Sequence, residues 1–166
     1  MFTFFMWLHI MSAIIAFGPT FSYPIMGMMV AKQPQHGLFV IKLQESVAMK
    51  LTYPLGAVVL PLAGIGMIWK LGGVSWLFET TWLLVGIGVY VVAMGYSMAV
   101  QTPTGMKLMH ALEKMPPGPP PEGSTGPPPE IAAMVKKLQL GGMFLTLMLI
   151  SIMVIMVFGA NGKLGS

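Results

Sequence analysis

The chain has 166 residues, of which 55% are hydrophobic and only 8% are charged, whereas soluble domains usually carry about a quarter charged residues. Its basic residues are all lysines, its acidic residues are all glutamates, and it has no cysteine. This composition excludes a soluble globular fold, disulfide bonds and cysteine metal sites. The scattered lysines also lack the dense basic surface of a nucleic-acid-binding protein.

We predict an all-α fold, a transmembrane four-helix bundle with long cytoplasmic helix extensions. The hydrocarbon core of a bilayer requires about 20 apolar residues per helix, and four apolar segments meet this requirement. They cover about residues 2–30, 51–69, 76–100 and 138–158. The whole chain, residues 1–166, is therefore expected to form a single integral membrane domain with little room for a soluble catalytic domain.

The first segment, residues 2–30, contains two helix-breaking residues and one ionisable residue. Pro19 and Pro24 each remove a backbone donor, so kinks are expected there. His9 lies in the second turn, near the outer surface of the membrane. An ionisable side chain within a span is costly and is therefore a candidate functional residue.

His9 is the candidate cofactor ligand, because imidazole is an axial ligand of heme. The competing interpretation is a neutral histidine that bonds a backbone carbonyl. A bis-histidine heme within one chain is disfavoured, since His36 and His110 are expected at the opposite membrane surface. A histidine–methionine pair stays open, and the methionines expected at helix ends near His9 are Met67, Met153 and Met156.

The connection after the first segment carries three lysines and one glutamate. Residues 38–50 mix Lys42, Glu45 and Lys50 with apolar residues, which is typical of an interfacial helix or one that projects into the cytoplasm. Glu45 is expected to pair with Lys42 or Lys50. No predicted span then contains a carboxylate at its midpoint, which argues against an ion-coupled transporter.

The second segment, residues 51–69, contains Pro54 and Pro61, and both are expected to kink the helix. Lipid-embedded helices tolerate such residues because neighbouring helices can satisfy the freed backbone groups. The third segment, residues 76–100, is predicted to continue as a polar helix as far as Leu112.

Glycines in three of the segments are predicted to mediate close helix packing. Gly88 and Gly95 are seven residues apart and share one face with Val91 and Val92, a pattern that lets lipid-embedded helices approach closely. The packing partner could lie within the bundle or in another subunit. The full set of predicted packing residues is Gly64, Gly88, Gly95, Gly141 and Gly142.

A proline-rich loop joins the third and fourth segments. Residues 115–129 hold eight of the 14 prolines, which favours an extended polyproline conformation of about 3 Å per residue. A simple linker is the favoured interpretation, and a docking segment for a proline-binding partner is the alternative.

The lysines predict the orientation of the chain. Seven of them lie in the two long connections, which share one membrane surface, and only Lys70 and Lys163 lie on the other. The positive-inside rule makes the connections cytoplasmic and puts both termini outside. We expect a multi-pass protein of the bacterial cytoplasmic (inner) membrane. The seven lysines are Lys32, Lys42, Lys50, Lys107, Lys114, Lys136 and Lys137.

The first helix also shows a family resemblance. Leu8-His9, Phe17-Gly18-Pro19-Thr20-Phe21 and Pro24 resemble a family of small bacterial four-helix integral membrane proteins of unknown function. The match covers about thirty residues; elsewhere only the hydropathy and the two long connections agree. More remotely, the layout looks like copper-resistance D domains and HemJ-type protoporphyrinogen oxidases. The latter resemblance implies heme b bound through His9, but no arginine is present to pair with porphyrin propionates.

The leading hypothesis is a non-enzymatic accessory or structural subunit of a larger bacterial membrane assembly, such as an energy-transducing complex. Its partners would be the lipid bilayer and other membrane subunits or a second copy, without nucleic acid. The sequence assigns no catalytic residue, no metal ligands and no cofactor to this role. The alternatives are a heme b- or quinone-linked redox protein that uses His9, and a small metal or solute transporter.

Overall fold

The computed structural model describes residues 1–32, 36–115 and 128–162, so most of the proline-rich loop 115–129 lies outside the described residues. Within these ranges the chain is helical almost throughout and contains no strand. The all-α prediction is confirmed.

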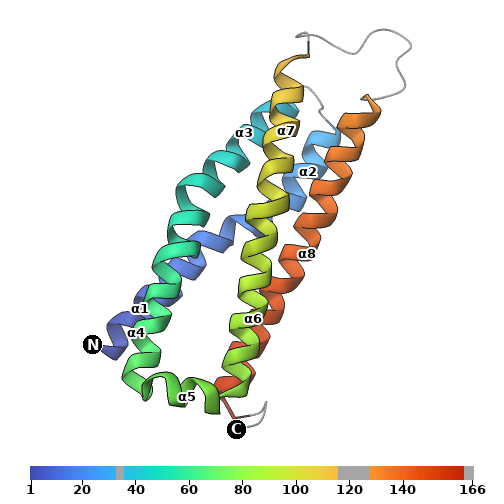
Figure 1. Ribbon diagram of the computed structural model, residues 1–166. Helices are drawn as coiled ribbons and strands as arrows, with labels where there is room; N and C mark the ends of the chain where they lie inside the picture. Colours follow the sequence, from blue (N-terminus) through green and yellow to red (C-terminus); the bar gives the residue numbers. More distant parts are fainter. Residues whose placement is uncertain (33–35, 116–127, 163–166) are drawn as a thin grey trace.

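Four helical stretches in the described part of the chain are long and apolar enough to cross a membrane. Each has the minimum length that about 30 Å of hydrocarbon requires, and the longest would extend about 50 Å at 1.5 Å per residue. The start of the first stretch, beside the label N, and the end of the last stretch lie at the same end of the bundle (Figure 1). The stretches are Phe2–Met29, Gly37–Leu71, Thr81–Glu113 and Pro129–Ala160.

The second stretch is longer than the sequence indicated. It runs without a break through α3 (Gly37–Val47), the π-helix η3 (Ala48–Val59) and α4 (Leu60–Leu71). The segment expected to precede the span is therefore continuous with it, as the first three turns of one 35-residue helix, and Glu45 belongs to that helix.

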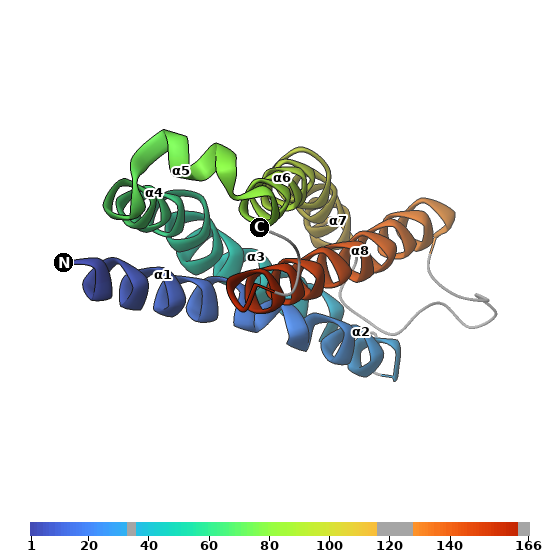
Figure 2. The same cartoon turned by 90° about the horizontal axis from the view of Figure 1, so that it is seen from below.

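The third stretch begins later than predicted. The chain turns at Gly72 and Gly73, whose φ values of 133° and 72° suit glycine. It then forms the short helix α5 (Gly73–Glu79) and breaks at Thr80. The backbone N–H of Leu83 donates to the Thr80 carbonyl across 3.0 Å, which starts α6 (Thr81–Tyr96). Figure 2 shows α5 bridging α4 and α6 across this end of the bundle.

The prolines lie where the helical period changes. Pro19 is in the first turn of η1 (Gly18–Ser22), a 3₁₀ helix that follows α1 (Phe2–Phe17). Pro54 is inside the π-helix η3, and Pro61 starts α4. Pro24 is in the first turn of α2 (Tyr23–Lys32). Each proline lacks a backbone donor, so a regular α-helical ladder cannot continue through it.

The helices pack as two pairs, and the bundle buries few large side chains. α1 packs on η3 and α4, while α6 packs on α8 (Pro129–Ala160). At the lysine-rich end, α3, α7 (Thr102–Glu113) and α8 enclose a small core of Ile41, Leu108 and Ile131. Water drives such burial outside the membrane, whereas lipid gives apolar side chains no reason to leave it.

Candidate functional site

His9 bridges the first and second membrane helices. Its Nδ1 lies 2.9 Å from the carbonyl oxygen of Leu60, and because a carbonyl only accepts, Nδ1 carries the hydrogen and donates. A Cβ added at Gly64 would lie 3.4 Å from the imidazole Cε1, so this predicted packing glycine leaves room for the ring. The neutral tautomer then leaves Nε2 with a lone pair.

Two hydroxyl groups satisfy carbonyls that prolines leave without a donor. In a 3₁₀ turn the donor to the Ala16 carbonyl would be residue 19, a proline, and the Thr52 hydroxyl donates to that carbonyl across 2.8 Å instead. In a π-helix each N–H bonds the carbonyl five residues earlier, as the Leu60 N–H does with the Leu55 carbonyl. By this pattern the donor to the Gly56 carbonyl would be Pro61, which has no N–H. Tyr90 donates to that carbonyl across 2.5 Å.

A small cavity of about 60 Å³ lies between the two helix pairs, where η1 interrupts the first helix. Apolar side chains form most of its wall, but four hydroxyl-bearing side chains also line it. One water molecule needs roughly 10–15 Å³ of such space and two to four polar partners, so the cavity can hold water. The four side chains are Thr20, Thr52, Tyr90 and Ser97.

A second polar cluster lies nearer the lysine-rich end. Oε2 of Glu45 and the hydroxyl of Tyr23 are buried and have no hydrogen-bond partner among the described residues. Tyr53 of η3 lies nearby, and its hydroxyl contacts Thr102 and lies 3.4 Å from the Ser97 hydroxyl. This cluster brings together residues that are far apart in the sequence.

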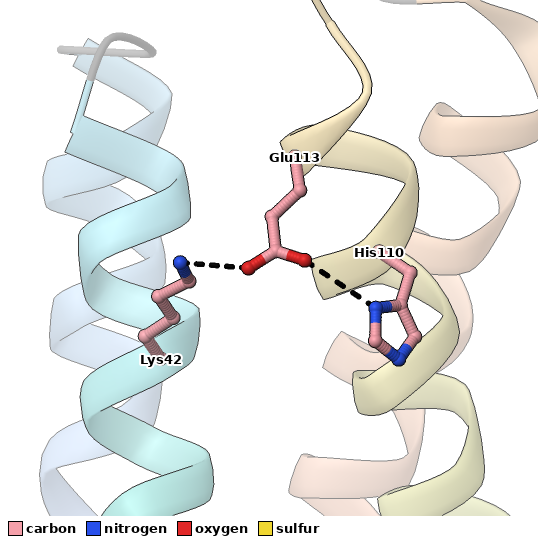
Figure 3. A network of polar contacts seen from close by, with 3 residues as sticks. All are labelled: Lys42, His110 and Glu113. Atoms are coloured by element: carbon pink, nitrogen blue, oxygen red, sulfur yellow. Dashed lines mark hydrogen bonds and ion pairs between the residues drawn. The ribbon is translucent and has the colours of Figure 1, made fainter.

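The predicted pairing of Glu45 with Lys42 or Lys50 is wrong for Lys42. Lys42 Nζ lies 2.7 Å from Oε1 of Glu113, whose Oε2 lies 3.3 Å from Nδ1 of His110 (Figure 3). Lys42 is on the exposed side of α3, whereas Glu45 faces α7. The signal in the sequence was the four-residue spacing of Ile41 and Glu45, which gives both residues one helix face.

The Lys42–Glu113–His110 network belongs to the part of the bundle outside the hydrocarbon. The stretch Thr81–Glu113 has 33 residues, about 50 Å, which exceeds a hydrocarbon core of about 30 Å, and the end that carries these exposed charged residues is the one that extends beyond it. Hydrogen bonds from Lys42 and His110 hold the pKa of Glu113 below its usual value. Both partners are exposed, so the pair contributes little to stability.

The predicted packing glycines differ in whether another part of the chain lies close to them. Gly141 lies against the Tyr96 hydroxyl and the Gln101 amide, and Gly142 has only Gln101 Nε2 at 3.9 Å from an added Cβ. An added Cβ at Gly88 or Gly95 would meet no described atom within 4 Å. These two glycines therefore serve no close packing inside the described part of the chain.

The structure brings neither a second histidine nor Met156 to His9 as a second axial ligand of heme, whereas Met67 belongs to α4, the helix that His9 contacts. Nε2 could supply one ligand, and the Nδ1 bond to a carbonyl is the arrangement that orients ligating histidines. Met156, however, packs against Gly86 in the α6–α8 pair, whereas His9 packs against α4. His36 and His110 lie at the opposite end, near the start of α3 and the end of α7.

Comparison with known proteins gives one match. A family model described as "Predicted integral membrane protein (DUF2269)" covers residues 3–159. Neither a curated protein nor a solved structure matches the chain.

Proposed function

Since this chain belongs to the DUF2269 family of predicted integral membrane proteins, we propose that it acts as a non-enzymatic accessory subunit of a larger membrane assembly. This assembly would be a complex of the bacterial cytoplasmic membrane, such as an energy-transducing complex. Both termini would be outside the cell, and the two lysine-rich connections would face the cytoplasm.

The outer face of α6 carries this proposal. Gly88 and Gly95 lie on it with Val85, Val91 and Val92, each of which is at least half exposed. Several other helical glycines touch side chains, and an added Cβ at Gly66 would meet the Phe5 ring at 2.7 Å, whereas Gly27 of α2 meets nothing within 4 Å, like Gly88 and Gly95. Glycine within a helix costs up to about 1 kcal/mol relative to alanine, so two glycines on an outer face are best explained by a helix of another protein.

The proposed partner is a transmembrane helix with large apolar side chains. Gly88 and Gly95 form a shallow apolar depression between valines, and van der Waals packing into such depressions drives helix association in lipid. The face carries no charge that could select an ionic partner, so shape is the basis of recognition.

Purification from native membranes in a mild detergent tests this function. Native mass spectrometry should detect a second polypeptide in fixed stoichiometry with the chain. The double substitution Gly88→Leu and Gly95→Leu should abolish its capture, because leucine fills the depression. Gly27→Leu is the matched control, since an added Cβ there also meets nothing within 4 Å. A monodisperse, partner-free particle contradicts the proposal, and a particle built only of this chain would replace it with self-association.

A heme b- or quinone-linked redox function through His9 is the second candidate. The Nδ1 bond to Leu60 supports it, because it leaves Nε2 free to bind a metal. The second heme ligand would be Met67 of α4 or a group of a partner. A visible absorption spectrum decides the heme version: a Soret band that disappears in His9→Ala supports it, and a featureless spectrum of the intact assembly removes it.

A further inference from the structure

Glu45 and Tyr23 each have a buried polar atom without a hydrogen-bond partner in the described part of the chain. A buried polar group without a partner costs about 1–3 kcal/mol, and an ionised carboxylate costs more. Native structures keep few such groups, and each one calls for an explanation such as a bound ion or a function.

The position of Glu45 is fixed by the approach of α3 to α7. Its Oε1 packs directly against Gly105, where any side chain would displace it. Tyr23 of α2 lies within electrostatic range of both Glu45 and Tyr53. Helices α2, α3 and α7 and the π-helix η3 therefore all contribute to the surroundings of this carboxyl group.

No cation among the described residues forms an ion pair with Glu45. The lysine one turn away on α3, Lys42, binds Glu113 instead, and Lys50 is exposed. Of the titratable groups, Tyr23 of α2 lies within electrostatic range of Glu45, and Tyr53 of η3 lies within range of Tyr23. The residue of α7 that packs against the Glu45 carboxyl is Gly105. An ionised Glu45 would therefore be a buried charge without compensation.

Apolar side chains separate Glu45 from the lysine-rich end. Ile41 is one turn closer to that end on α3, and with Leu108 and Ile131 it forms the buried cluster there. Toward the middle of the bundle lies a group of hydroxyls, in which Tyr53 contacts Thr102. Tyr53 lies 3.4 Å from Ser97, which also lines the 60 Å³ cavity.

We propose that Glu45 is a proton-binding site within the membrane bundle. Its carboxylate accepts a proton from a hydronium ion: one O–H bond of the hydronium ion breaks, the O–H bond of a neutral carboxylic acid forms, and a water molecule is left. The hydroxyls of Tyr23, Tyr53 and Ser97 would carry the proton between this site and the cavity. This inference goes beyond the accessory role and is independent of the outer face of α6.

Labelling with dicyclohexylcarbodiimide tests the site, because this apolar reagent reacts with protonated carboxyl groups in apolar surroundings. Exposed glutamates have a pKa near 4.3 and are almost fully ionised at pH 7. Peptide mapping of the wild-type protein at pH 7 should therefore show label on Glu45 at a level about tenfold above Glu113 or Glu79. Infrared spectroscopy should show a carboxylic-acid C=O band under the same conditions.

Two matched substitutions complete the test. Glu45→Gln should remove both the label and the infrared band, and Glu113→Gln should leave both unchanged. Should Glu45→Gln not fold, the wild-type map still decides, and Tyr23→Phe should keep the label on Glu45. Label on Glu45 no stronger than on Glu113 in the folded wild-type protein, or an infrared spectrum without the acid band, would overturn the proposal.

Discussion

The hydroxyl of Tyr90 donates a 2.5 Å hydrogen bond to the carbonyl oxygen of Gly56, and this bond joins the two helix pairs of the bundle. The acceptor is available because Pro61, five residues further along the π-helical period, has no N–H to donate. The tyrosine on one helix thus supplies the hydrogen bond that the proline on another helix cannot make.

Tyr90→Phe should destabilise the protein by about 0.5–1.5 kcal/mol, the range for a lost hydrogen bond inside a membrane bundle. The substitution removes only the phenolic hydroxyl and leaves the Gly56 carbonyl without its donor. Thermal unfolding in detergent measures the effect. Ser151→Ala is the control, since the Ser151 hydroxyl only bonds its own helix, at the Leu147 carbonyl. Equal stability of Tyr90→Phe and wild type would contradict this role.

Gly159→Ala and Gly86→Ala should differ although both glycines touch a neighbour closely. An added Cβ at Gly159 would lie 2.5 Å from Cγ of Trp82, near the rigid part of the indole, whereas at Gly86 it would meet the terminal methyl of Met156 at 2.5 Å. The methionine can move away and the tryptophan cannot. We expect a loss of about 1–3 kcal/mol at Gly159 and less than about 1 kcal/mol at Gly86.

Thermal unfolding of the two variants side by side provides the measurement. Gly88→Ala is a useful third variant, because nothing lies within 4 Å of its added Cβ, and the isolated chain should tolerate it fully. A similar loss at Gly86 and Gly159 would show that the packing around Met156 is as rigid as that around Trp82.

The Lys42–Glu113 pair should make stability depend on acid pH. Because the pKa of Glu113 is lowered in the folded protein, its contribution to the free energy of unfolding is present above the unfolded pKa of about 4.3 and is lost as the pH falls through the folded value. The melting temperature of the wild-type protein should therefore fall more between pH 5 and pH 3 than that of Glu113→Gln. Parallel pH profiles for the two proteins would disagree with this assignment.

The proposed orientation can be tested with single cysteines, since the wild-type chain has none. Ala133 and Asn161 are exposed near the two ends of α8. A membrane-impermeant maleimide should label Asn161→Cys in intact cells and Ala133→Cys only after the membrane is opened. The reverse pattern would invert the topology and overturn the positive-inside assignment.

The four membrane helices could be predicted from hydropathy because each apolar stretch is set by local composition. The missing N–H of each proline is likewise a property of the residue itself, whereas the kinks at Pro19, Pro24, Pro54 and Pro61 stay predictions. The break at Thr80 was not predicted, because it depends on the Leu83 N–H reaching the Thr80 carbonyl. Nor was the burial of Glu45, which depends on the packing of α3 against Gly105 some sixty residues later.

The Gly56 carbonyl also has a consequence for membrane insertion. The second membrane helix carries an acceptor that only a side chain of the third can satisfy, and the first carries one at Ala16 that depends on Thr52 of the second. Each of the first two helices thus enters lipid with one backbone carbonyl that has no hydrogen-bond donor until the next helix is inserted. The first three helices should leave the insertion machinery as a group, whereas α8, which has no internal proline after its first turn, can enter the bilayer alone.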